Sequence, residues 1–267
     1  MSSFQTLEIN NTSFLICDNG TGDPVLFVHG ACGSVTHGEA LASRLAGRYR
    51  FISYSQRFHL PNPPQADGAY NADTHAADLI ALVETLGIQG CKVIGHSYGC
   101  SVILTAAAMR NEIFGSLYLA EPGLAFLLNN NDSYQKIREE RADTFRRIKT
   151  CFEEGKSADA VSTLMRYANG ARGFIAFPEK IRWDMLANAS SLHRLVYESA
   201  MSTLQAEDLK TITIPVKVLL GQHCTPVYKA VTEEIKKHIP HAEVKTIPDC
   251  AHDLVYVRPR EVAMAIG

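Results

Sequence analysis

The sequence predicts an α/β fold in which helices cover both faces of a mostly parallel sheet of eight strands. Short apolar runs alternate with helical patterns, and their hydrophobicity is continuous, which is typical of strands buried on both faces. Five such runs are Val25–His29, Phe51–Tyr54, Lys92–Ile94, Leu117–Ala120 and Val216–Leu220. A sixth strand is expected at Glu243–Ile247, and Phe4–Ile9 with Ser13–Cys17 indicates an antiparallel hairpin.

The expected helices follow from apolar residues at spacings of three and four. Ala76, Leu79 and Val83 form such a stripe, and Gly87 is a typical residue to end that helix. Later helices are expected near Val227–His238 and after Asp253.

The alternation of strands and helices breaks between residues 122 and 209, where the pattern is mostly helical. We therefore expect residues 1–121 and 210–267 to form the sheet-and-helix core, and residues 122–209 to be a helical insertion. This insertion is rich in aromatic residues and methionine, which could be a plain core of their own or could cover an apolar pocket. They include Tyr134, Phe145, Phe152, Met165, Tyr167, Phe174, Phe177, Trp183, Met185, Tyr197 and Met201.

Composition and charge limit the binding partners and the cellular compartment that we expect for this protein. With 26 Lys plus Arg against 28 Asp plus Glu, the net charge is −2, which argues against nucleic acid or an anionic membrane as a partner. The seven cysteines are odd in number and form no C-x-x-C or metal-finger spacing. We find no signal-peptide pattern and no apolar stretch long enough to span a membrane. A cytoplasmic protein, monomeric or homodimeric, without cofactor or metal is expected.

The sharpest motif is Gly95-His96-Ser97-Tyr98-Gly99, which directly follows an expected strand and opens a helical run. A strand that turns abruptly into a helix strains the backbone at the serine, and the flanking glycines remove the Cβ clashes that would prevent the turn. The serine hydroxyl then projects above the carboxyl end of the sheet. This context favours Ser97 as a nucleophile over a structural serine.

An oxyanion hole is expected from two backbone N–H groups, those of Ala31 and Tyr98. Ala31 lies in a loop of small residues after the first buried strand, where bulky side chains would block the approach to an oxygen atom. Gly30 could be merely a turn former. In the same segment, His29 is more consistent with a structural histidine than with a base.

A serine nucleophile needs an imidazole that takes its proton and later returns it. Of the ten histidines, His252 is favoured because it follows the last expected strand, after Ser97 in the chain. His96 is expected to point away around the turn and to be structural. The remaining histidines have no comparable context.

On these residues the chain resembles the α/β-hydrolase superfamily, in its branch with a serine nucleophile. The resemblance rests on the His29-Gly30 loop, the Gly95–Gly99 turn, Ile214-Pro215 before a strand, and a late His252. It implies the fold, and it implies that residues 122–209 occupy the place of the helical cap of that superfamily. It says little about the substrate.

One departure from the superfamily concerns the acid that orients the histidine. The loop that usually supplies it reads Gly221-Gln-His-Cys224-Thr-Pro226 here and holds no carboxylate. Glu121 is the favoured replacement because it ends the strand Leu117–Ala120, on the same sheet edge as Ser97. Certain haloalkane dehalogenases and a fungal lactonase group of the superfamily place a Glu there. Asp249 or Asp253, or no acid at all, remain alternatives.

A second departure lies at residues 53–61, where Ser55 stands in place of a common Asp and the usual glycines are missing. This loop normally borders the entrance of the site in the superfamily. Arg57, Phe58 or His59 could therefore touch substrate, and a salt-bridged Arg57 that fixes the loop is an equal alternative.

Together these features predict a cofactor-independent serine hydrolase that cleaves an ester or lactone of a medium-sized, largely apolar small molecule. Ser97, His252 and Glu121 would form the triad. The same arrangement serves carbon–carbon hydrolases, lyases and other enzymes of the superfamily, which remain an alternative. A small-molecule receptor that keeps a slow triad is a second alternative.

Overall fold

The computed structural model describes residues 3–64, 68–198 and 202–267. Within these residues, eight strands form one sheet in the order β1-β2-β4-β3-β5-β6-β7-β8. Only β2 runs antiparallel to its neighbours, and the other pairs are parallel, so the predicted sheet is confirmed. The strands are β1 (Ser3–Ile9), β2 (Thr12–Asn19), β3 (Asp23–Val28), β4 (Tyr49–Tyr54), β5 (Cys91–His96), β6 (Phe114–Ala120), β7 (Val216–Gly221) and β8 (Glu243–Ile247).

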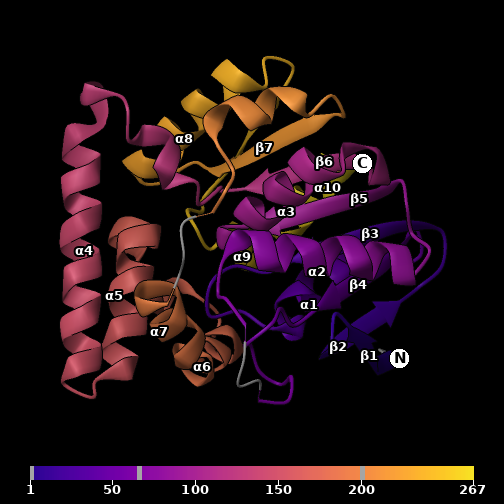
Figure 1. Ribbon diagram of the computed structural model, residues 1–267, viewed down its shortest axis with the longest axis horizontal. Coiled ribbons are helices and arrows are strands. Elements are labelled where there is room, and N and C mark those ends of the chain that lie inside the picture. Colours follow the sequence, from indigo (N-terminus) through magenta and orange to yellow (C-terminus); the bar gives the residue numbers. More distant parts are fainter. Residues whose placement is uncertain (1–2, 65–67, 199–201) are drawn as a thin grey trace.

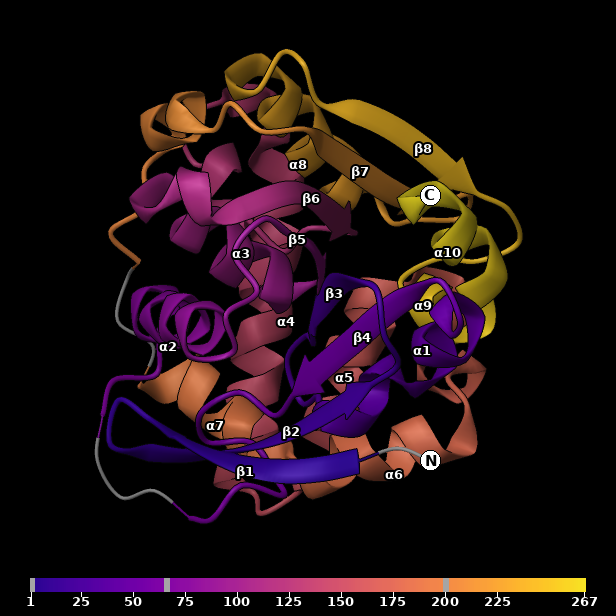
Figure 2. The ribbon, with the colours of Figure 1, turned by 90° about the vertical axis from the view of Figure 1, so that its right-hand side faces the viewer.

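Helices cover both faces of this sheet (Figure 1 and Figure 2). One face carries α2 (Ala72–Thr85), α3 (Tyr98–Met109) and α8 (Pro226–His238), whose apolar side chains share one buried cluster. The other face carries α1 (Glu39–Leu45), α9 (Leu254–Val257) and α10 (Pro259–Ile266), within a second cluster. Alternate residues of β3 contribute to the two clusters, as expected for a strand buried on both sides.

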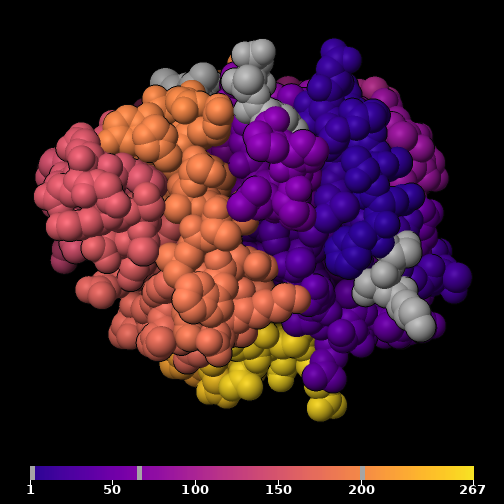
Figure 3. Space-filling model, turned by 90° about the horizontal axis from the view of Figure 1, so that it is seen from below, coloured from indigo at the N-terminus to yellow at the C-terminus, as the bar shows by residue number. Residues whose placement is uncertain are grey.

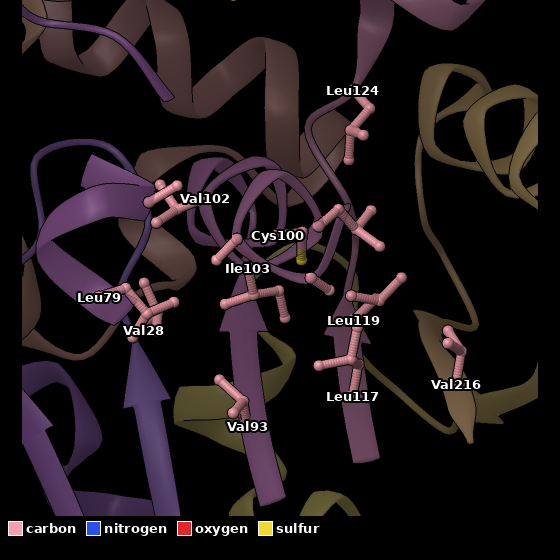
Figure 4. Close-up of a cluster of buried hydrophobic side chains, with 14 of the residues drawn as sticks. Val28, Leu79, Val93, Cys100, Val102, Ile103, Leu117, Leu119, Leu124 and Val216 are labelled. Carbon is pink, nitrogen blue, oxygen red and sulfur yellow. The ribbon is translucent and has the colours of Figure 1, made fainter. Parts of the chain in front are cut away.

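The first cluster places helix α3 firmly on the central strands (Figure 4). Ile103 of α3 is fully buried, as are Val93 on β5 and Leu119 on β6. Because β5 and β6 are central and α3 packs on them, the residues at their carboxyl ends sit on a rigid support. Ser97 and Glu121, two of the predicted site residues, directly follow these ends.

The β1–β2 hairpin turns at Asn10 and Asn11, which both have positive φ, 50° and 55°. Asparagine tolerates this left-handed conformation, and two such residues make the turn whose twist matches that of the flanking strands. The hairpin adds an antiparallel edge to the parallel core.

The described residues between β6 and β7 contain four α-helices, namely α4 (Gln135–Glu153), α5 (Ser157–Asn169), α6 (Glu179–Ala187) and α7 (Ala189–Tyr197). They gather at one end of the sheet (Figure 1). Short 3-10 helices complete the secondary structure at Val35–Gly38, Asn111–Ile113, Ala125–Leu128, Asp132–Tyr134, Gly170–Arg172, Phe174–Ala176 and Ala206–Thr211.

This helical segment packs against the first half of the chain along a seam that Figure 3 shows between the orange and purple residues. The backbone N–H of Leu60 donates a hydrogen bond of 2.7 Å to Asn188 Oδ1 across it. Phe177 is buried against the ring of Tyr256, with centroids 5.8 Å apart. Trp183, in contrast, is 64% exposed, and Met201 lies outside the described residues.

Two negative findings concern the described residues. None of their helices is both long enough and apolar enough to cross a membrane. Cys32, Cys91, Cys100, Cys151, Cys224 and Cys250 are free thiols, and all of these but Cys151 are buried.

Candidate active site

Ser97 stands at a strained turn between β5 and α3. Its φ of 55° and ψ of −118° lie outside the regions that a non-glycine residue ordinarily adopts. Two hydrogen bonds hold it there: its N–H donates to the carbonyl of Ala120 at 2.9 Å, and its carbonyl accepts from Gly123 N–H at 3.1 Å. The surrounding backbone therefore imposes the conformation, as is common at functional sites.

The glycines of the motif allow α3 to begin this close to the sheet. A Cβ added to Gly99 would lie 2.3 Å from the carbonyl oxygen of Val28, and one added to Gly95 would lie 2.9 Å from Cys100 N. Both distances are shorter than any ordinary carbon contact. Only glycine therefore fits at these two positions.

Ala31 and Tyr98, whose N–H groups are expected to bind an oxyanion, line the same cavity as Ser97. Tyr98 is the first residue of α3, so its N–H has no acceptor within the helix. Ala31 lies in the loop after β3, and both residues line the cavity. Gly30 lets this loop approach the nucleophile, because a Cβ there would lie only 3.0 Å from Ser97 Cβ.

Glu121 and His252 form a buried contact beside Ser97. The distance from His252 Nδ1 to Glu121 Oε2 is 2.9 Å, and the Glu121 side chain is fully buried. Its other oxygen, Oε1, accepts a hydrogen bond of 3.0 Å from Gly221 N–H at the end of β7. A carboxylate from β6 thus reaches the imidazole while the backbone of the next strand fixes its orientation.

Burial shifts the pKa values of both groups in opposite directions. Loss of water raises the pKa of Glu121, and the hydrogen bond from Gly221 N–H opposes that rise. The same loss of water lowers the pKa of His252 to about 3. The imidazole is therefore neutral at pH 7, and when its Nδ1–H faces Glu121, the Nε2 lone pair is free to accept a proton.

The two other acids considered for this role are engaged elsewhere. Asp249 has a 71% exposed side chain and pairs with Arg258 at 3.2 Å. Asp253 is fully buried, pairs with Arg172 at 2.9 Å and accepts the Ala251 N–H. Among the described residues, the carboxylate in contact with the His252 ring is that of Glu121.

Cys224 occupies the loop after β7 that lacked a carboxylate. Its side chain is buried, and its pKa is raised to about 11, first by burial and second by the charge of Glu121. The Glu121 carboxylate therefore lies close to the thiol. The acid at the end of the neighbouring strand therefore lies beside the cysteine of this loop.

The expectation that His96 points away from the site is wrong. Its ring packs on that of His252, with centroids 4.6 Å apart, and it lines the cavity. Its Nε2–H donates to the His252 carbonyl at 2.9 Å, so it supports the backbone of that residue. His29 is tied instead to the Gln56 N–H, through a 3.0 Å bond to its Nε2.

The loop at residues 53–61 does not reach the cavity. Arg57 makes two hydrogen bonds to Asp78, of 2.8 and 2.7 Å, in a buried pair. Neither Arg57, Phe58 nor His59 lines the cavity. Of the two alternatives for this loop, the structure shows the salt-bridged arginine.

The cavity above Ser97 has a volume of about 190 Å³ and a mostly apolar wall. The segment between β6 and β7 supplies much of that wall, including Phe145, Met165, Tyr167 and Met185. Part of the aromatic and methionine content of this segment therefore faces the nucleophile. The described residues contain no group of three His, Cys, Asp or Glu side chains that could hold a metal ion.

Tyr228 is a site residue that the sequence did not reveal. Its ring stacks on His252 at an interplanar angle of 10°, with centroids 4.6 Å apart. Its hydroxyl lies 3.4 Å from His252 Nε2. A tyrosine in the first turn of an amphipathic helix carries no sequence signal for such a role.

The comparison with family models decides the family. The model of the alpha/beta hydrolase family matches residues 25–265, nearly the whole chain. The chain belongs to the α/β hydrolase family. The sn-1-specific diacylglycerol lipase ABHD11 of Mus musculus is 23% identical over 94% of this chain and 82% of its own length.

Two solved structures share this fold. A bromoperoxidase from Bacillus anthracis superposes with a TM-score of 0.80 at 21% identity, over 99% of this chain and 98% of the other. Est816, described as an N-acyl homoserine lactone degrading enzyme, superposes with a TM-score of 0.78 at 18% identity, over 98% of both chains. At such identities the likeness shows the fold of this α/β hydrolase.

The two arginine partners test the assignment of Asp253 and Asp249 as structural acids in this α/β hydrolase. Arg172→Met leaves the buried Asp253 charge without its partner, so we expect it to lower the free energy of unfolding by about 3 kcal/mol. Arg258→Met breaks a surface pair and should cost less than about 1 kcal/mol. Denaturant unfolding of both variants measures the difference, and equal effects would contradict the assignment.

Proposed function

We propose that this α/β hydrolase is a cofactor-independent serine hydrolase that cleaves an ester or lactone of a medium-sized, largely apolar small molecule. The observation that carries the proposal is the buried 2.9 Å contact of Glu121 with His252, beside a strained Ser97 that opens into an apolar cavity. Relatives described as a lipase, esterases and a lactone-degrading enzyme support the same chemistry.

In the proposed mechanism, Ser97 Oγ attacks the carbonyl carbon while its proton passes to His252 Nε2. The carbonyl electron pair moves to oxygen, where the Ala31 and Tyr98 N–H groups stabilise the charge. The imidazolium then gives its proton to the leaving alkoxide, and an acyl-enzyme remains. Water, deprotonated by His252, attacks this ester and releases the acid and Ser97.

Glu121 would act through His252 rather than on the substrate. It holds Nδ1–H toward itself, so that Nε2 faces the cavity, and it stabilises the imidazolium as that charge forms. Because the site is buried, this charge has little water to stabilise it, which makes the carboxylate more important.

The proposal includes the division of the chain into a catalytic core, residues 1–121 and 210–267, and a cap, residues 122–209. Support comes from Phe145, Met165, Tyr167 and Met185, which the segment contributes to the cavity wall. We also propose that the protein works in the cytoplasm as a monomer or homodimer. The free thiols of Cys32, Cys91, Cys100, Cys151, Cys224 and Cys250 are consistent with a reducing compartment.

Ser97→Ala tests the reaction class. We expect it to reduce the hydrolysis of p-nitrophenyl esters and of lactones by at least about 10³-fold, because no other group can form the acyl-enzyme. Ser101→Ala, four residues further along the same helix, is the matched control and should retain activity. A wild-type protein without Ser97-dependent turnover, and without labelling by a fluorophosphonate, would contradict the proposal.

Glu121→Gln tests the acid. The amide keeps the shape but cannot hold the imidazole as a carboxylate does, so we expect kcat to fall by about 10³–10⁴-fold with an unchanged circular dichroism spectrum. Asp249→Asn removes a carboxylate close to His252 in sequence and should leave kcat unchanged. A nearly normal kcat in Glu121→Gln would exclude it as the orienting acid.

A further inference from the structure

One charged side chain lines the cavity above Ser97, and the proposed mechanism does not use it. Among the described residues that line this cavity, Arg141 is the only Asp, Glu, Lys or Arg. Arg141 lies on α4, in the helical segment between β6 and β7, whereas Ser97 directly follows β5. The cation and the nucleophile therefore line one cavity from two different parts of the fold.

The guanidinium of Arg141 is available to a ligand. Arg146, further along α4, pairs with Asp143, whereas Arg141 makes no ion pair with any residue in the described part of the chain. Its guanidinium lies 4.5 Å from the centroid of the Phe145 ring, and Phe145 lines the cavity as well. This cation–π contact holds the charge at the cavity wall without supplying an acceptor for its N–H groups.

Arg141 also marks the side on which the cavity meets the solvent. The residue is exposed, although it is part of the cavity wall. A ligand charge bound here stays close to water and does not have to enter the buried interior, where an unpaired charge would be costly. A charged group at this end of a ligand is therefore compatible with the apolar wall further in.

Tyr167 provides a second polar group in the same wall. It lies on α5, which runs beside α4 (Figure 1), and it lines the cavity. Its hydroxyl oxygen is buried and has no hydrogen-bond partner among the described residues. Burial raises the pKa of Tyr167 to about 12, so the hydroxyl keeps its proton at pH 7 and can donate it. An unsatisfied buried hydroxyl is costly, and a ligand oxygen would satisfy it.

The chemistry of these two groups favours a carboxylate over other anions. A guanidinium presents two parallel N–H groups that match the two oxygens of a carboxylate, and a phenol adds a third donor. One cation balances one negative charge. A phosphate monoester carries about −1.5 to −2 charges at pH 7, so part of its charge would remain unpaired beside apolar side chains.

We propose that Arg141 and Tyr167 bind a carboxylate of the substrate, an inference that rests on the proposed function. The substrate class is then an ester or lactone with an apolar middle part and a carboxylate at the end away from the reacting carbonyl. The middle part contacts Phe145, Leu164 and Met165, which line the cavity. The substrate is thus largely apolar and carries its charge at the end near the solvent.

Two ester probes that differ only in this charge test the subsite. They are mono-p-nitrophenyl adipate and its neutral methyl ester, and the measured quantity is the KM of the charged probe divided by that of the neutral one. Arg141→Met should raise this ratio about 10-fold, because the charge-assisted contact is lost. Arg146→Met, on the same helix but exposed and paired with Asp143, is the matched control and should leave the ratio unchanged.

Graded variants separate the charge from its geometry. Arg141→Lys keeps the charge but loses the paired N–H groups, so its KM ratio should lie between those of the wild type and Arg141→Met. Tyr167→Phe removes a neutral donor and should raise the ratio by about 3-fold. Tyr197→Phe, the same chemical change at an exposed position of α7, is its control. An unchanged ratio in Tyr167→Phe would exclude the phenol from the subsite.

Salt gives an independent readout because Arg141 is exposed. Raising sodium chloride from about 10 mM to about 500 mM screens an exposed charge pair, so it should lower the wild-type kcat/KM for the charged probe. The same change should have no such effect in Arg141→Met. Equal salt dependence in the two proteins would contradict the subsite.

Binding to a protein that cannot turn over separates this inference from the proposed function. Monomethyl adipate should bind to Ser97→Ala in calorimetry, and the added Arg141→Met change should weaken that binding about 10-fold. Hexyl phosphate should bind to Ser97→Ala more weakly than hexanoate, and the reverse order would overturn the choice of a carboxylate.

The outcomes fall into two groups. Equal affinity for monomethyl adipate with and without Arg141, or an unchanged KM ratio in Arg141→Met, would overturn the carboxylate subsite and leave the hydrolase in place. Binding that depends on Arg141, in a protein whose wild type turns over no ester, would overturn only the proposed function.

Discussion

The buried hydrogen bond between Glu121 and His252 is the constraint on which the rest of the site depends. It joins the end of β6 to the loop after β8, and Gly221 N–H at the end of β7 fixes the second carboxylate oxygen. The Glu121 side chain therefore connects the ends of β6 and β7 with the loop after β8. The backbone supports this position, since Glu121 itself has a φ of 44° and donates its N–H to Leu219 of β7.

A second consequence of this bond concerns the loop after β7. Because the carboxylate enters from β6, the loop needs no acid, and a buried Cys224 fills the place. The following helix is then free to present Tyr228 against the imidazole. His96 also packs on the His252 ring, with centroids 4.6 Å apart. The buried imidazole is thus held by a carboxylate at Nδ1 and by aromatic rings.

The helical segment between β6 and β7 supplies much of the apolar wall around Ser97. Its apolar side chains close the cavity above Ser97, and burial in turn shifts the pKa values of Glu121 and His252 toward their uncharged forms. In such surroundings any new charge, whether an oxyanion, an imidazolium or a substrate carboxylate, depends on fixed partners. Among the described residues, Arg141 is the one Asp, Glu, Lys or Arg side chain in the wall of this cavity.

Much of this protein follows from its sequence, because local patterns determine which segments become strands and helices. The eight strands, the hairpin at Asn10-Asn11 and the strained turn at Ser97 each depend on a few neighbouring residues. Glu121 could be named as an orienting acid because parallel strands end at one sheet edge. The position of His96 and the places of Tyr228 and Arg141 in the site could not be predicted from the sequence. Each depends on a side-chain direction that is set by packing between elements far apart in the chain. Only the tertiary structure brings α4, α5 and α8 around Ser97, since their apolar faces are buried together with the sheet and not within any one segment.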